Sequence, residues 1–258
     1  MKCKLDPGGF PERKLSEAPS LAPGQMRELQ RIAQEDYGID ILVMTENAGR
    51  SAATLALAML GGRGRGQKVV VLAGGGNKGA AGLCAARHLT NWGANVEPVF
   101  GEVEGEMSGI ARKQVQILRS AGILRPGDEE TSEITLEDHL EAADLVIDAL
   151  VGYGAMGPPT GMGAAITQLA RAAKRPILAL DMPTGVSAAT GEAFDPAIRA
   201  STTLALDLPK AGMKEPASRA YIGELYLADL GVPRAVHERM GIKLNGLFAD
   251  GPIIRLRR

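Results

Sequence analysis

The stretch VVVLAGGGNKGAAGLCAARHL, residues 69–89, joins an apolar run to an alanine-rich segment with helical spacing. Five glycines fall within positions 74–82, and Lys78 stands among them. A buried strand followed by a glycine turn and a helix is typical of the first unit of an α/β sheet. The start of the helix then points backbone N–H groups toward a ligand. This stretch therefore predicts an α/β fold with a binding loop at residues 74–79.

The rest of the chain extends the same alternation. Apolar runs that read as further strands lie at 95–100, 144–150, 176–181, 202–206 and 224–230, and helical patterns lie at about 41–60, 80–92, 107–122 and 162–173. Because the strands are apolar on consecutive positions, both faces of the sheet should be covered. We predict a Rossmann-like, doubly wound, mostly parallel sheet in an α/β/α three-layer sandwich. Residues 1–21 are expected to form a flexible arm, residues 22–258 a single domain, and the basic tail DGPIIRLRR a frayed terminus.

Composition limits the function classes. The formal net charge is −1, from 29 basic and 30 acidic residues, so we expect no nucleic acid and no membrane surface as partner. Cys3 and Cys84 give neither a disulfide framework nor metal-ligand spacing. The N-terminus lacks the apolar segment of a signal peptide. We expect a cytoplasmic protein that binds a small molecule.

Three features follow directly after predicted strands. They are the glycine loop from Gly74 to Gly79, Asp148 and Asp181. The carboxyl ends of parallel strands meet at one edge, where open α/β sheets bind ligands. Each feature also has a purely structural explanation, because glycines permit tight turns and aspartates cap helices. Their convergence nevertheless favours a binding cleft at this edge.

Two nucleotide-binding readings of the loop are weaker. Gly74, Gly76 and Gly79 fit the dinucleotide fingerprint, with Glu97 or Glu102 near the distance of a ribose-binding acid. An NAD-dependent oxidoreductase would also need a proton relay, and no such set occurs at a suitable spacing. The loop is no phosphate-binding P-loop, because Lys78 precedes a glycine and no Gly-Lys-Ser/Thr follows.

Five blocks follow one another between about residues 22 and 230. They are PGQMRELQRIAQEDYGIDILVMTENAGRSAA, AGGGNKGAAGLCAARHL, DLVIDALVGYGAMGPPTG, PILALDMPTGVSAATGE and TLALDLPKAGM. In this order they resemble the signatures of the YjeF N-terminal domain, the NAD(P)H-hydrate epimerase family. The resemblance implies a nucleotide-binding isomerase that interconverts the R and S forms of hydrated NADH or NADPH. It also implies a homodimer and functional pairing with a separate dehydratase.

The resemblance assigns roles to residues of three loops. The aspartate of the DMPTG turn, Asp181, contacts substrate and is the candidate acid/base, with Lys210 as a second catalytic group. Hydrated NAD(P)H enters as substrate rather than as cofactor. The residues implied to hold it are Gly76, Asn77, Lys78 and Gly79 in the first loop, and Gly152, Tyr153, Gly154, Ala155, Met156, Gly157 and Pro158 in the second.

The first loop departs from the family pattern G-x-G-N-N-G-G-D-G. Lys78 replaces the second asparagine and Ala81 the acidic residue. The family implies a potassium ion near Asp148 and Thr184, and the loss of an oxygen ligand argues against it here. We hypothesise that the ammonium of Lys78 takes the place of the ion beside Asp148; the alternative is that Lys78 points to solvent. The departures also leave open a catalytically silent member that binds a nucleotide-like ligand or a protein partner.

Five polar residues outside these loops need an interpretation. Glu46 and Asn47 match the N-terminal signature of the family, and we expect a local role, with Asn47 bonded to a neighbouring loop; the alternative is a direct contact with the ligand. His88 is interpreted as a helix-packing residue. His139 and His237 have no sequence partners that suggest a metal, so we predict no zinc site.

Overall fold

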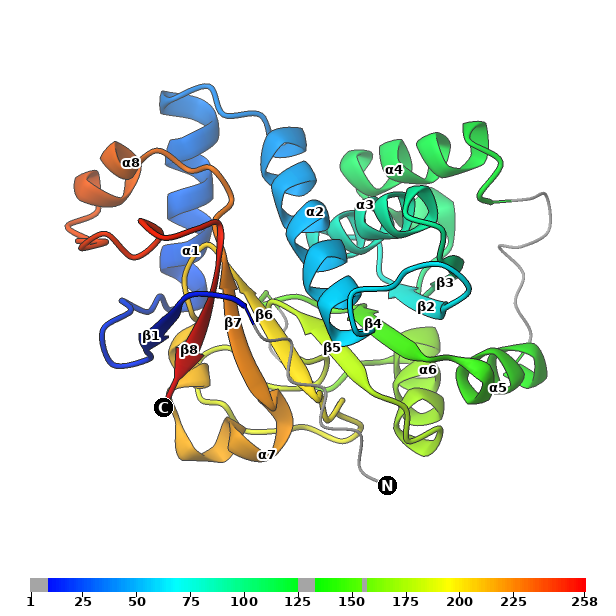
Figure 1. Cartoon of the computed structure of the whole chain (residues 1–258). Coiled ribbons are helices and arrows are strands. Elements are labelled where there is room, and N and C mark those ends of the chain that lie inside the picture. Colours follow the sequence, from blue (N-terminus) through cyan, green and yellow to red (C-terminus); the bar gives the residue numbers. More distant parts are fainter. Residues whose placement is uncertain (1–8, 125–132, 155–156) are drawn as a thin grey trace.

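The computed structural model describes residues 9–124, 133–154 and 157–258, and one sheet organises this part of the chain (Figure 1). The sheet has eight strands in the order β1-β8-β7-β6-β5-β4-β2-β3, and every neighbouring pair is parallel except β7 with β8. The strands are β1 (Glu12–Lys14), β2 (Lys68–Ala73), β3 (Asn95–Phe100), β4 (Leu145–Ala149), β5 (Ile177–Leu180), β6 (Thr202–Leu206), β7 (Glu224–Ala228) and β8 (Ile253–Arg257). The predicted mostly parallel α/β fold is confirmed.

The order of the central strands fixes the place of the site. Counted from β2, the order β3-β2-β4-β5-β6 is the doubly wound arrangement 2-1-3-4-5. The chain direction of the crossovers reverses between β2 and β4, and ligands bind beyond the carboxyl ends of the strands at such a switch point. The loops that follow β2 and β4 begin at Gly74 and Leu150, so the glycine loop lies at this point.

Helices cover the two faces of the sheet (Figure 1). On one face lie α1 (Pro23–Arg31), which a π-helical turn continues over Ile32–Asp36, α2 (Ile41–Met59), α3 (Asn77–Asn91), α4 (Gly109–Ser120) and α8 (Arg234–Arg239). On the other lie α5 (Glu133–Ala142) and α6 (Gly161–Ala172), with the short α7 (Arg219–Ile222) near the ends of β6 and β7. Three 3-10 turns complete the set, at Glu104–Glu106, Ala211–Met213 and Pro216–Ser218. No helix in the described ranges is long and apolar enough to cross a bilayer.

Helices α2 and α3 pack unusually closely. Asp40 caps α2 by accepting a hydrogen bond from the N–H of Leu42, and small residues then fill the face that meets α3. A side chain at Gly49 would overlap Cys84 of α3. This close approach holds the N-terminus of α3 firmly against α2, where it forms part of the site.

Both ends of the described chain differ from the sequence-based expectation. Residues 12–14, expected within a flexible arm, pair with β8, and Leu15, Ala18 and Leu21 are buried behind them. The tail, expected to be frayed, forms β8 and pairs antiparallel with β7. The physical reason is the alternation in PIIRLR, which places Ile254 and Leu256 in the core. Arg255 between them forms ion pairs with Glu12 and Glu224, and Arg257 after them pairs with Glu12.

Candidate functional site

A cavity of about 260 Å³ lies at the carboxyl edge of the sheet, beside the switch point. Its floor comes from the loops after β2, β4, β5 and β6, and its roof from α1 and α2. The predicted site residues that line it are Gly76, Asn77, Lys78, Gly152, Tyr153, Gly154, Asp181 and Lys210. The structure therefore brings the first loop and the catalytic candidates to one cavity.

The glycine loop has two different tasks. Gly74 and Gly79 allow backbones to touch, because a side chain on Gly74 would overlap the carbonyl of Leu150 and one on Gly79 the carbonyl of Gly74. Gly76 and Asn77 are exposed at the start of α3, toward the cavity. The unpaired N–H groups and positive dipole end of this 15-residue helix suit an anionic ligand group.

Lys78 turns inward, so the alternative of a solvent-facing side chain is wrong. Its Nζ donates to the carbonyl of Met182 at 2.8 Å, the carbonyl of Val151 at 3.0 Å, Asp148 Oδ1 at 3.2 Å and Thr184 Oγ1 at 3.3 Å. All four partners accept, because the Thr184 hydroxyl gives its own proton to Asp148 at 2.6 Å. An oxygen cage of this kind matches a charged ammonium.

Asp148 is the centre of this cage and is fully buried. Besides Lys78, it accepts hydrogen bonds from the N–H of Thr184 at 2.7 Å and the N–H of Leu150 at 3.2 Å. Burial lowers the pKa of Lys78 below the usual lysine value, and the charge of Asp148 opposes that shift. The pair ties the loops after β2, β4 and β5 together.

The same contacts test whether potassium fits between Asp148 and Thr184. The oxygen atoms that face a common point there already accept hydrogen bonds from Lys78 Nζ. An added cation would meet a positive charge at that point rather than free oxygen ligands. The arrangement of these side chains does not fit a bound potassium ion.

A second buried pair, Asp181 with Lys210, contributes to the same cavity. The two side chains form an ion pair, and their residues are 3% and 0% exposed. Lys210 Nζ also donates to the carbonyls of Leu206 at 2.8 Å and Leu208 at 3.0 Å. Asp181 has a φ of +62°, a conformation that few residues other than glycine adopt. This is backbone strain directly at the cavity, which is common at functional sites.

Tyr153 covers the lysine of this pair. Lys210 Nζ lies 5.7 Å from the centre of the Tyr153 ring, within the range of a cation–π contact. The Tyr153 hydroxyl donates to Gln30 Oε1 of α1 at 2.8 Å. Burial, followed by the charge of Asp181, raises the pKa of Tyr153 to about 12, so the phenol stays protonated near neutral pH. The ring thus closes one side of the cavity.

The described residues of the second loop after Gly154 do not line the main cavity. Pro158 lines another cavity, of about 520 Å³, together with Gly74, Leu150 and the start of α6. Ala155 and Met156 lie outside the described residues, and Gly157 follows them. The structure therefore places Gly152 to Gly154 at the main cavity and Pro158 at a neighbouring one.

Sequence reasoning missed the roof of the cavity. Met26 and Gln30 of α1 and Ile41, Met44 and Thr45 of α2 line it. The apolar spacing of both helices was visible in the sequence, but it did not show that their apolar faces leave room for a ligand instead of closing on the sheet.

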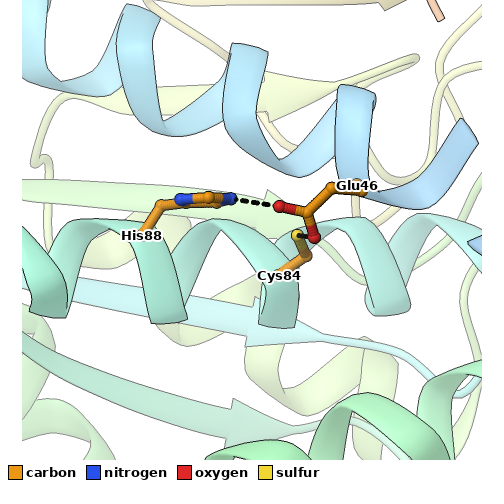
Figure 2. Close-up of side chains that lie close together, drawn as sticks. All are labelled: Glu46, Cys84 and His88. Atoms are coloured by element: carbon orange, nitrogen blue, oxygen red, sulfur yellow. Dashed lines mark hydrogen bonds and ion pairs between the residues drawn. The ribbon is translucent and has the colours of Figure 1, made fainter. Parts of the chain in front are cut away.

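A polar cluster joins α2 and α3 close to this roof (Figure 2). Glu46 accepts from His88 Nε2 at 2.8 Å, from Cys84 Sγ at 3.2 Å and from Arg87. Burial acts to raise the pKa of Glu46, but the hydrogen bonds from Cys84 and His88 and the charge of Arg87 lower it overall. Asn47 donates to the carbonyl of Leu230 at 2.8 Å, which confirms its expected contact with a neighbouring loop.

The ligand atoms of Glu46, Cys84 and His88 lie within 4.8 Å of one another and are of the types that bind zinc. However, the guanidinium of Arg87 contacts both Glu46 and Cys84 and already compensates the carboxylate charge. Burial also raises the pKa of Cys84 to about 12, with Glu46 adding to the shift, so the thiol remains protonated. These contacts make the cluster a clamp between two helices.

A cavity at the switch point of a doubly wound sheet, with an ion pair on its floor and a helix N-terminus at its edge, is the arrangement in which α/β proteins bind small polar ligands. Comparison with known proteins gives the family. Residues 41–212 match the family described as YjeF-related protein N-terminus. The chain belongs to this family.

Individual relatives agree with this assignment. The chain is 39% identical over 234 residues to an NAD(P)H-hydrate epimerase of Dehalogenimonas lykanthroporepellens, with 90% of each chain covered. It is 33% identical over 213 residues to the bifunctional NAD(P)H-hydrate repair enzyme Nnr of Moorella thermoacetica, covering 81% of this chain and 40% of that protein. The crystal structure of the yeast protein ynu0, YNL200c, has the same fold, with a TM-score of 0.79 and 22% identity over 92% of this chain and 100% of its own.

Proposed function

We propose that this protein is an NAD(P)H-hydrate epimerase, an isomerase that interconverts the R and S forms of hydrated NADH or NADPH. The observation that carries the proposal is the ion pair of Asp181 with Lys210 in a cavity at the switch point. Relatives that bear this name and align over nearly the whole chain support the choice of reaction.

The chemistry requires a group that moves a proton and a group that faces a cation. Inversion of the hydrated ring carbon proceeds when hydroxide leaves with help from the ring nitrogen and water adds to the opposite face. Lys210 polarises the departing hydroxyl. Asp181 exchanges the proton that the incoming water releases and the departing hydroxide takes up, and its carboxylate faces the transient cationic ring. Both groups are withdrawn from bulk water, which strengthens their interaction with a developing charge.

The dinucleotide needs an anchor for its pyrophosphate. The N–H groups at Gly76 and Asn77, at the start of α3, support that role. Gly152, Tyr153 and Gly154 form the facing wall of the cavity. We propose that the nicotinamide end enters this cavity, because a volume of about 260 Å³ suits one ring and its ribose rather than the whole dinucleotide.

Lys78 serves, in this proposal, in place of the potassium ion that the family pattern implies. One ammonium and one potassium ion carry the same charge, and the four oxygen partners of Lys78 support the exchange. Asp148 and Thr184 would then hold the loops in position through a side chain instead of a metal.

A second candidate is a catalytically silent member that binds a nucleotide-like ligand or a protein partner. Ala81 favours it, because this residue lines the cavity where the family pattern has a carboxylate. If that carboxylate is essential for turnover, binding would survive its loss and catalysis would not.

A partner enzyme, a homodimer and a cytoplasmic location are part of the same proposal. We propose that the protein acts with a separate dehydratase, in keeping with its similarity to bifunctional NAD(P)H-hydrate repair enzymes. The exposed apolar side chains of Tyr37, Leu42 and Val43 beside and at the start of α2 support a homodimer. The free thiol of Cys84 is in keeping with a cytoplasmic location.

The test is a coupled assay with purified R-form hydrated NADH and a dehydratase specific for the S form. The epimerase should accelerate the recovery of NADH absorbance in proportion to its concentration. Recovery at the spontaneous rate, together with saturable binding of the hydrate, would support the silent member and reject the enzyme. Asp250→Asn, at an exposed residue near β1, is a matched control that should keep full activity.

A further inference from the structure

Asp207, just after β6, occupies a strained turn. Its φ is +64°, and the N–H of Leu208 donates to the carbonyl of Leu206 at 2.9 Å. A hydrogen bond between residues two apart, around a centre with positive φ, defines a γ-turn of the rare and strained kind. For a residue other than glycine, such a conformation persists only when its surroundings enforce it.

The carboxylate of Asp207 is bound by His237 of α8, while its N–H donates to the carbonyl of Ala228 at 2.9 Å. His237 Nε2 lies 3.0 Å and 3.2 Å from the two carboxylate oxygens of Asp207, and both residues are 1% exposed. Burial acts to lower the pKa of His237, but the hydrogen bond and charge of Asp207 raise it overall. A protonated imidazole neutralises the buried carboxylate of Asp207 and donates to it through Nε2.

The turn matters because of what its neighbours bind. The carbonyls of Leu206 and Leu208, on either side of Asp207, both accept hydrogen bonds from Lys210 Nζ. On either side of one extended residue the two carbonyls point the same way, sideways from the strand, and lie about 6.6 Å apart, whereas a tight turn lets both converge on one donor. The same ammonium forms the ion pair with Asp181.

We propose that Asp207 and His237 are positioning residues for Lys210: their buried pair enforces the γ-turn that aims two carbonyls at the Lys210 ammonium and so fixes it against Asp181. The proposal rests on the proposed epimerase site. It assigns a role to α8, which lies beyond residues 41–212 where the family matches. Neither residue is among those that line the cavity, so the pair acts through the backbone.

The first test compares two substitutions of Asp207. Asp207→Ala removes the pairing and leaves a residue that disfavours positive φ, whereas Asp207→Gly removes the pairing but adopts the turn freely. We expect Asp207→Ala to lower kcat by about tenfold to a hundredfold with little change in KM, and Asp207→Gly to retain clearly more of it. Equal losses in both variants would overturn a role in holding the turn.

The second test uses His237→Gln, which keeps a neutral donor and cannot titrate. The charged groups around His237 are Asp207 and, after β7, Asp229, with Arg234, Glu238 and Arg239 on its own helix. His237 has a raised pKa, so its charge is present at lower pH and is lost as the pH rises through that value. The wild type should therefore lose kcat along an alkaline limb that His237→Gln lacks. His139→Gln, on distant α5, should keep the limb.

A readout without activity separates this proposal from the enzyme function. The ¹⁵N–¹H signal of the Lys210 ammonium, identified by its absence from Lys210→Met, should exchange slowly in the unliganded wild type. It should shift and exchange faster in Asp207→Ala and in His237→Gln. An unchanged signal in His237→Gln overturns the positioning role, even if Asp207→Ala fails to fold. A changed signal in a protein without epimerase activity sustains the positioning role and rejects only the proposed function.

Discussion

Replacing Lys78 by methionine should strongly destabilise the protein. The change keeps the volume of the side chain but leaves Asp148 fully buried without its counter-charge. Removing one partner of a buried ion pair typically costs about 3 to 5 kcal/mol. The lower end applies here, because Thr184 and Leu150 still donate to the carboxylate. At about 2 to 4 °C per kcal/mol for a domain near this size, we expect Tm to fall by roughly 10 °C.

Calorimetry at neutral pH measures this loss, with Lys113→Met, an exposed residue on α4, as the matched control. The control should stay within about 0.5 kcal/mol of the wild type. A Tm of Lys78→Met within 2 to 3 °C of the wild type would refute the buried-pair reasoning.

A companion variant tests the replacement of the ion. Lys78→Asn restores an oxygen ligand and removes the ammonium, so potassium should raise its Tm while lithium should not. The wild type should be indifferent to the choice of cation. A potassium-specific rise in the wild type would show that Lys78 does not occupy an ion site.

Three further predictions concern other parts of the fold. Glu46→Gln should cost about 1 to 2 kcal/mol in urea unfolding near pH 7. Because the pKa of Glu46 is lowered in the folded state, that cost should shrink as the pH falls through the folded-state pKa. A cost that is constant with pH would contradict the role of the Glu46 carboxylate in holding α2 and α3 together. Leu256→Ala, at a residue only 3% exposed in β8, should cost about 2 to 5 kcal/mol. A cost near zero would mean that the tail is frayed after all. Cys84, with a pKa raised to about 12, should resist thiol reagents at pH 8 in the native state and react after denaturation, as mass spectrometry would locate.

The sheet was predictable because its strands carry a strong local signal. Consecutive apolar residues such as those of β2 and β4 allow only a strand covered on both faces, and glycine or aspartate marks where each one ends. Strand β1 at the edge of the sheet and its neighbour β8 were not predicted, because they are short, carry several arginines and lysines, and gain their stability from distant partners.

The site was predictable only in part, because local patterns mark the ends of strands but not the contacts between distant loops. Asp148 lies near the carboxyl end of β4, and Asp181 and the first loop follow β5 and β2, so the topology brings them to one edge. The inward turn of Lys78 depends on carbonyls from two other loops, which no local pattern reports. The pairing of Asp207 with His237 joins residues 30 positions apart through a turn whose strain is invisible in the sequence.

In the proposed reaction, Asp181 exchanges a proton during inversion of the hydrated ring carbon. To test this role, the reaction is started from the pure R epimer, without any second enzyme, and the formation of the S epimer by wild type and by Asp181→Asn is followed by chromatography. We expect the wild type to reach the equilibrium mixture far faster than the spontaneous reaction, and Asp181→Asn to bind the hydrate yet match the spontaneous rate. Full-speed inversion by Asp181→Asn would show that Asp181 does not exchange the proton.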